Sequence, residues 1–133
     1  MNTRTVETLE TRENVNALVQ CGKLLHHLQG ENAALKTQLA EVIRVCADSE
    51  QLETLESFQA RFIAKDTVIA IVRRDLAKLV ATSRSEAFPT PEQGTASVKF
   101  GRDMLCMKEQ FLNLRNEFEE YLTNIPEFSA LRT

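Results

Sequence analysis

The most regular pattern in the chain lies between Leu18 and Cys46, where large apolar residues recur at alternating spacings of three and four positions. A period near 3.5 residues is typical of a helix with one apolar stripe, which packs against other helices as in a coiled coil. One polar residue, Asn32, interrupts the stripe. The pattern predicts a long first helix over about residues 5–46. We call its apolar stripe the seam, which consists of Leu18, Cys21, Leu25, Leu28, Leu35, Leu39, Val42 and Cys46.

A second stretch with a helical period follows directly. Asp48 and Gln51 have the spacing of a capping box, so we expect a second helix over about residues 49–83. Lys65 and Asp66 interrupt its apolar stripe, and they mark either a kink or the start of a separate helix. The run 67–72 is rich in β-branched residues, which also suits a strand. The helix formers on both sides, without turn residues between, favour a helix.

The last third of the chain is predicted to contain a loop, a third helix and a short tail. Residues 84–96 include two prolines, a glycine and several Ser and Thr, which is typical of a loop. This connection is either a crossover to a distant face or a functional segment. Residues 97–123 form the predicted third helix, and its Phe and Met side chains suit a core of several helices. Residues 124–133 are the tail.

These elements together predict the fold class. The short connection after Cys46 makes the first two helices antiparallel, and 133 residues suffice to bury a core without metal or disulfide. We expect one all-α domain over residues 1–133. It is a long-helix antiparallel bundle with coiled-coil character, completed by oligomerisation.

Asn32 is the most informative single residue. It shares a heptad position with Leu25 and Leu39, where two parallel chains would bring two amides into contact and fix their register. Glu31 and Lys36 flank it at the spacing of an interchain ion pair. These features predict self-association, with a dimer favoured. The predicted residues are Leu18, Leu25, Leu28, Glu31, Asn32, Leu35, Lys36, Leu39 and Val42.

An alternative remains open for the same residue. Leu24, Ile43 and Val45 widen the apolar surface beyond what a two-stranded seam needs. In that case the seam is one wall of an intramolecular bundle, and Asn32 faces solvent at its edge.

Composition and charge narrow the classes of partner. The net charge of −3 is spread along the chain, so no concentrated basic face is available for nucleic acid. No apolar run approaches the ~20 residues that cross a bilayer. The polar N-terminus does not resemble a signal peptide, and three cysteines without paired spacing suit a reducing compartment. We therefore expect a cytoplasmic protein without a membrane span.

The sequence offers no pattern typical of catalysis or metal binding. His26 and His27 are adjacent, so on a helix they point about 100° apart and cannot chelate one metal from the same face. Neither a glycine-rich phosphate loop nor a nucleophile motif is present. We expect no catalytic, cofactor or metal site.

The sequence therefore predicts a non-enzymatic helical interaction or scaffold protein that self-associates through the seam. The alternative is a small acidic helical chaperone or adaptor, in which the seam stays open until a client's amphipathic helix occupies it. The expected partner is a second copy in the first case and another helical protein in the second.

Overall fold

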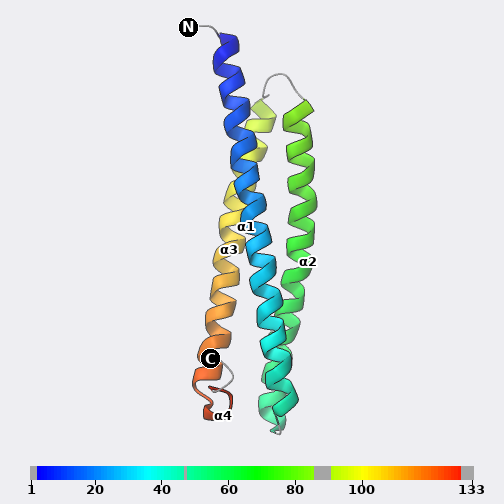
Figure 1. The fold of residues 1–133 in the computed structure, drawn as a ribbon, viewed down its shortest axis with the longest axis vertical. Helices are drawn as coiled ribbons and strands as arrows, with labels where there is room; N and C mark the ends of the chain where they lie inside the picture. Colours follow the sequence, from blue (N-terminus) through cyan, green and yellow to red (C-terminus); the bar gives the residue numbers. More distant parts are fainter. Residues whose placement is uncertain (1–2, 47, 86–90, 130–133) are drawn as a thin grey trace. The chain divides into compact units, whose positions relative to one another are not determined.

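The structure is a computed structural model that describes residues 3–46, 48–85 and 91–129, and nearly all of these are helical (Figure 1). Three long helices, α1 (Thr3–Val45), α2 (Ser49–Ser85) and α3 (Pro91–Thr123), are followed by the single turn α4 (Pro126–Ser129). No strand occurs among the described residues. The predicted all-α class and its long antiparallel helices are confirmed.

The helix boundaries differ from the prediction mainly around the second connection. α3 begins at Pro91, six positions before the predicted start at 97, so part of the predicted loop 84–96 is helical. Proline at the first helical position sacrifices no hydrogen bond and has a suitable φ, which explains why it does not delay the helix. Residues 86–90 of the loop lie outside the described residues. The predicted tail contains α4.

α2 is continuous through both places where the sequence left alternatives open. Residues 67–72 are helical, and the helix continues across Lys65 and Asp66, so a strand or a separate helix at these positions is wrong. Its start is capped as predicted. The carboxylate of Asp48 accepts hydrogen bonds from the backbone N–H groups of Glu50 (2.8 Å) and Gln51 (3.2 Å), which would otherwise lack partners.

The chain divides into two compact units, each of which contains segments of all three long helices. The first unit comprises Met1–His27 and Ala70–Met107, and the second comprises Leu28–Ile69 and Lys108–Thr133. The grouping of residues 1–133 into a single domain stays a prediction.

In the first unit, α1, α2 and α3 pack through aliphatic residues, Phe and Met. Leu18 and Leu25 of α1, Leu76 of α2, and Phe100, Met104 and Met107 of α3 are buried. Gly22 of α1 lies close to Leu76, because a Cβ built on this glycine would be 3.5 Å from the Leu76 Cδ2 atom. Leu105 on α3, by contrast, is 65% exposed.

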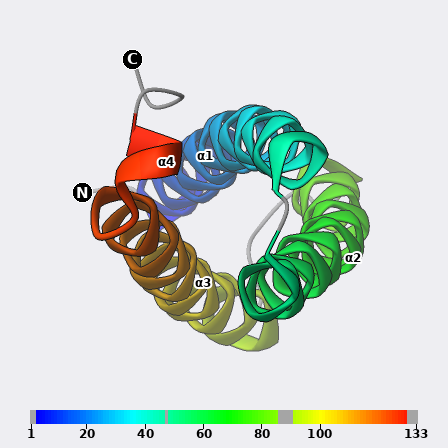
Figure 2. The same cartoon turned by 90° about the horizontal axis from the view of Figure 1, so that it is seen from below.

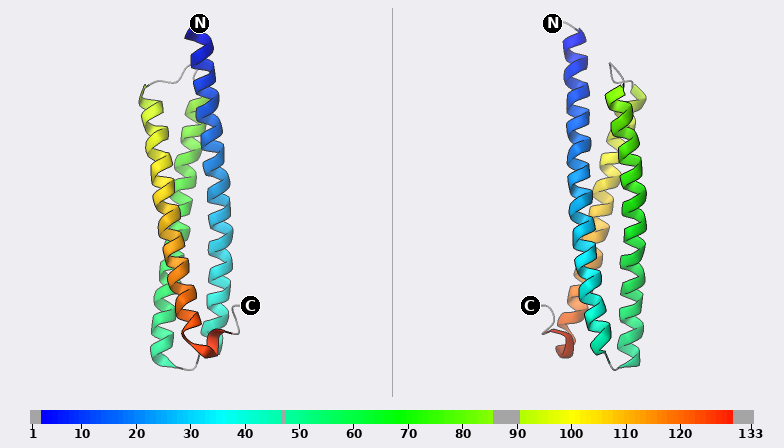
Figure 3. Two further views of the ribbon diagram at one scale, coloured as in Figure 1. Left: turned by 90° about the vertical axis from the view of Figure 1, so that its left-hand side faces the viewer. Right: turned by 45° about the vertical axis from the view of Figure 1, so that its right-hand side comes forward.

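In the second unit, aromatic side chains dominate the core. The ring of Phe118 on α3 lies 5.4 Å from the rings of both Phe58 and Phe62 on α2, and Tyr121 lies 5.7 Å from Phe58. On the α1 side, this core contains four buried residues of the seam, Leu28, Leu35, Leu39 and Val42. The ribbons in Figure 2 show α1, α2 and α3 as three neighbouring helices seen end-on, and Figure 3 shows α2 running opposite to the other two.

Candidate functional site

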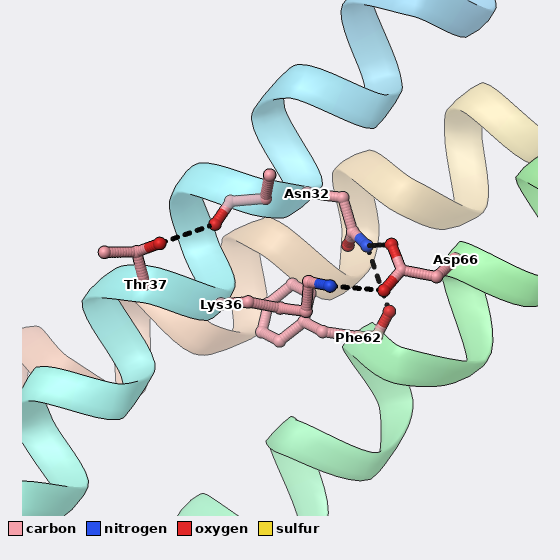
Figure 4. A network of polar contacts seen from close by, with 6 residues as sticks. Asn32, Lys36, Thr37, Phe62 and Asp66 are labelled. Atoms are coloured by element: carbon pink, nitrogen blue, oxygen red, sulfur yellow. Dashed lines mark hydrogen bonds and ion pairs between the residues drawn. The ribbon is translucent and has the colours of Figure 1, made fainter.

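A polar layer crosses the apolar core of the second unit at Asn32 (Figure 4). The Asn32 side chain is 0% exposed, and its amide nitrogen donates to the Phe62 carbonyl oxygen (3.0 Å) and to Asp66 Oδ1 (2.7 Å). Lys36, one turn further along α1, forms an ion pair with Asp66 Oδ2. Both groups that Asn32 faces on α2 are acceptors, so the amide nitrogen rather than the oxygen must point toward α2.

This layer fixes how α1 and α2 pair in the second unit. Sliding α1 by one turn would separate Asn32 and Lys36 from Asp66 and leave a buried amide without its partners. In a purely apolar seam the same shift would cost much less free energy, because each leucine would be replaced by another one along the helix. Asn32 therefore determines register, as the sequence suggested, but within one chain.

α3 joins the polar layer through a second ion pair. Arg115 donates to both carboxylate oxygens of Glu31, at 3.1 and 3.3 Å, and both side chains are about one-third exposed. Two buried polar atoms in the described part of the unit, Asn32 Oδ1 and Arg115 Nε, have no hydrogen-bond partner. Incomplete pairing of buried polar groups opposes stability, so this layer contributes more to a unique pairing of the helices than to stability.

The structure places the predicted self-association residues inside the bundle. The apolar ones are at most 7% exposed: Leu18, Leu25, Leu28, Leu35, Leu39 and Val42. Glu31 and Lys36 contact Arg115 and Asp66 of the same chain. The alternative in which Asn32 faces solvent is wrong, because that side chain is fully buried. Self-association through the seam stays a prediction, and it requires the helices to separate first.

A second stripe of mainly apolar residues, not predicted from the sequence, lies on the side of α2 opposite the buried one. Within the second unit it consists of Ala60, Ile63, Ala64, Thr67 and Val68, which we call the outer face of α2. All five are exposed, Ile63 by 53% and Val68 by 40%. These residues are alternately three positions and one position apart, which places them on one side of a helix. The stripe was therefore visible in the sequence. It was obscured because the same helix carries a stronger stripe of Leu and Phe.

A pocket adjoins this outer face, where α2 and α3 meet in the second unit. It has a volume of about 370 Å³ and is lined by Arg61, Ala64, Lys65, Val68, Gln110, Asn113 and Leu114. Arg61 forms an ion pair with Glu117 at its edge. Its lining combines three apolar side chains with two basic residues and two amides. Such a mixture suits the side chains of a docked helix.

The described part of the chain was also compared with what metal binding, thiol chemistry and membrane insertion require. No three His, Cys, Asp or Glu side chains there lie close enough to hold a metal ion. Burial raises the pKa of the Cys21 thiol, which lowers the fraction present as the nucleophilic thiolate. None of the described helices combines the length and apolar character needed to cross a membrane.

Comparison of the chain with models of protein families, with curated proteins and with solved structures finds no match in any of the three. Among the described residues of the second unit, the candidate sites are the polar layer, which pairs α1 with α2, and the outer face of α2, which is exposed.

Proposed function

We propose that the protein is a non-enzymatic helical interaction module that associates with a second copy of itself through the outer face of α2. The observation that carries the proposal is the exposed stripe from Ala60 to Val68, which no described segment of the chain covers. Grouped exposed apolar residues are a common mark of protein interaction sites, whereas single ones are not.

An identical copy is the occupant that best matches this face. Two-fold dimers bury the same patch on both partners, so the patch must suit itself. The five residues of the outer face carry no charge, and two such faces leave no buried charge unpaired when they meet. Ala60, Ala64 and Thr67 are small, which lets two helices approach closely.

This surface differs from the seam in what association requires. The outer face of α2 is exposed in the folded chain and binds without rearrangement. The seam becomes available only when buried leucines such as Leu28 and Leu35 leave the core. The free energy of opening would be subtracted from that of association, so the outer face of α2 is the favoured surface.

The expected association is weak. One helical face is small compared with a standard interface, which buries about 800 Å² on each partner. We therefore expect a dissociation constant in the micromolar range or above. The protein should be largely monomeric at about 1 μM and increasingly dimeric toward about 1 mM, a range that spans association free energies from about −8 to −4 kcal/mol.

Sedimentation equilibrium across this concentration range tests the proposal. We expect the mass of the parent protein to rise toward that of a dimer, and Ile63→Glu and Val68→Glu to remain monomeric with unchanged helical content. Leu105→Glu is the matched control, because Leu105 is more exposed than either residue and lies on α3 in the first unit. It should associate as the parent does.

Two outcomes would reject the proposal. A parent protein that stays monomeric at every concentration has no self-association to explain. A dimer that persists in Ile63→Glu and Val68→Glu, but is lost in a folded Leu28→Glu variant, would move the interface to the seam.

The pocket supports a second candidate function, that of an adaptor for an acidic amphipathic helix. Lys65, Gln110 and Asn113 line the pocket without a hydrogen bond or ion pair among the described residues. A ligand carboxylate would complement the Lys65 charge. A monomeric parent that binds an acidic amphipathic peptide, and loses that binding in Lys65→Glu, would favour the adaptor.

A further inference from the structure

The pocket between α2 and α3 in the second unit has hydrogen-bond donors from both helices at one level. The two helices are antiparallel, and Arg61 on α2 forms an ion pair with Glu117 on α3. A step forward along α2 therefore corresponds to a step back along α3. Lys65, one turn after Arg61, is level with Asn113, one turn before Glu117, and both line the pocket.

The donors at this level are available to a ligand. Lys65 is half-buried, and neither it nor Asn113 forms a hydrogen bond or ion pair among the described residues. The same holds for Gln110, the other amide of the lining. Glu109 precedes Gln110 in the chain but does not line the pocket, because consecutive residues point about 100° apart on a helix.

The carboxylates closest to the pocket in the chain are already paired. Glu117 forms its ion pair with Arg61 at the edge. Asp66 follows the pocket lysine directly, but its carboxylate binds Asn32 and Lys36 of α1. The lining contains two basic residues and no acidic one. One positive charge, that of the lysine, is therefore left for an anionic ligand.

The rest of the lining is apolar. It consists of Ala64 and Val68 on α2 and Leu114 on α3, of which Leu114 is 2% exposed and Val68 40%. The volume of about 370 Å³ falls within the range of about 300–1,000 Å³ that is usual for small-molecule sites. The lining residues of α2 span 61–68, a length of about 10 Å. A short ligand with a charged end and an apolar body matches these dimensions.

We propose that this pocket binds a small amphiphilic carboxylate. Its carboxylate accepts hydrogen bonds from the Lys65 ammonium and the Asn113 amide, and its apolar chain covers Ala64, Val68 and Leu114. Charge-assisted hydrogen bonds to the carboxylate select the anion, and burial of the chain supplies apolar contact. This binding function goes beyond the proposed self-association and does not depend on it.

Titration with sodium decanoate, below the concentration at which it forms micelles, tests the proposal. The protein carries Ile63→Gln, a change on the outer face of α2 but outside the pocket, so that self-association does not compete. NMR spectra of isotope-labelled protein should show saturable shifts of the amide signals of residues 61–68 and 110–114. Decylamine and decan-1-ol have the same chain without the carboxylate, and we expect them to bind at least about tenfold more weakly.

Substitutions in the pocket identify the groups that bind the carboxylate. Lys65→Gln should weaken decanoate binding by about tenfold or more, and Asn113→Ala by about fivefold, because the first removes a charged donor and the second a neutral one. Lys108→Gln is the matched control: it removes the same charge from an exposed residue of α3 outside the pocket. It should bind decanoate like the unsubstituted pocket. Circular dichroism should show unchanged helical content in all of them.

Three results would overturn the proposal. They are decanoate that leaves the pocket signals unchanged, decanoate that binds no more tightly than decylamine or decan-1-ol, and an affinity that Lys65→Gln does not alter. An acidic amphipathic peptide that binds where decanoate does not would keep the adaptor function and reject the small-molecule site. Self-association is decided separately, by the mass of the parent protein without decanoate.

Discussion

The inner and outer faces of α2 are both apolar, yet only one of them is core. The inner face carries Leu55, Phe58 and Phe62, which are at most 7% exposed, whereas the outer face carries Ala60, Ile63 and Ala64. The two faces alternate along the same turns of one helix. They differ in side-chain size, because the inner face contains Phe and Leu and the outer face is mostly Ala and Thr.

The difference shows how a bundle chooses between two apolar stripes. Burying a large side chain gains more free energy than burying an alanine, so the face with the greater apolar area is directed into the core. The smaller stripe remains outside, where it is available for a partner. A helix with two apolar faces therefore indicates both a core and a candidate interface.

The largest expected difference between the two faces is in the free energy of unfolding when adjacent residues, one from each face, are substituted. Phe62→Ala removes a fully buried ring that contacts Phe118, and we expect a loss of about 3–5 kcal/mol in the free energy of unfolding. Ile63→Ala should change it by no more than about 0.5 kcal/mol, since Ile63 is 53% exposed. Urea denaturation of dilute, monomeric protein measures both. Equal losses in the two variants would contradict the assignment of the faces.

Asn32 tests the polar part of the inner face, with a smaller expected effect. Asn32→Ala removes the hydrogen bonds to Phe62 and Asp66, one of which is charge-assisted, and should cost about 2 kcal/mol. Asn113→Ala is the control, because Asn113 is exposed and forms no hydrogen bond in the described part of the chain. Its effect should be within about 0.5 kcal/mol. A stability unchanged by Asn32→Ala would mean that the polar layer does not hold α1 against α2.

The smallest expected effect concerns the pKa of Tyr121, which depends on how far the inner face shields its phenol from water. Burial raises the pKa of Tyr121, and a hydrogen bond with Thr54 partly opposes this. The folded protein therefore retains the phenol proton at higher pH than the unfolded chain, so stability should fall as the pH rises above about 10.

Absorbance titration measures this pKa directly, because Tyr121 is the only tyrosine. We expect a midpoint above about 10 in the parent. Phe58→Ala, which removes the ring packed on Tyr121, should shift the midpoint down toward the ordinary value. A midpoint at or below about 10 in the parent would contradict the burial of Tyr121 by the inner face.

Much of the fold was predictable because helical periodicity is a local property. The seam predicted a long first helix, Asp48 predicted the start of the second, and the Phe and Met positions predicted a core of several helices. The start of α3 at Pro91 was not predicted. Proline is common both in loops and at the first position of a helix, so the sequence pattern there resembles a loop.

The candidate sites were predicted less completely. Asn32 was identified as the residue that sets register, but its predicted partner was another Asn32. The structure supplies Asp66 instead, from 34 positions away in the chain. A heptad pattern specifies that an interior position is polar, but not which helix approaches it. The outer face of α2 was not predicted, because its spacing is visible in the sequence but only burial distinguishes it from the core.

The sequence by itself determined the three long helices and the stripes along them, because each depends on residues three and four positions apart. The tertiary structure decided which stripe is covered and by which helix. That choice depends on the combined area and polar pairing of three helices, and these are non-local. The seam, whose leucines suggested an interface, is the core of this chain, and the candidate interface lies on the weaker stripe of α2.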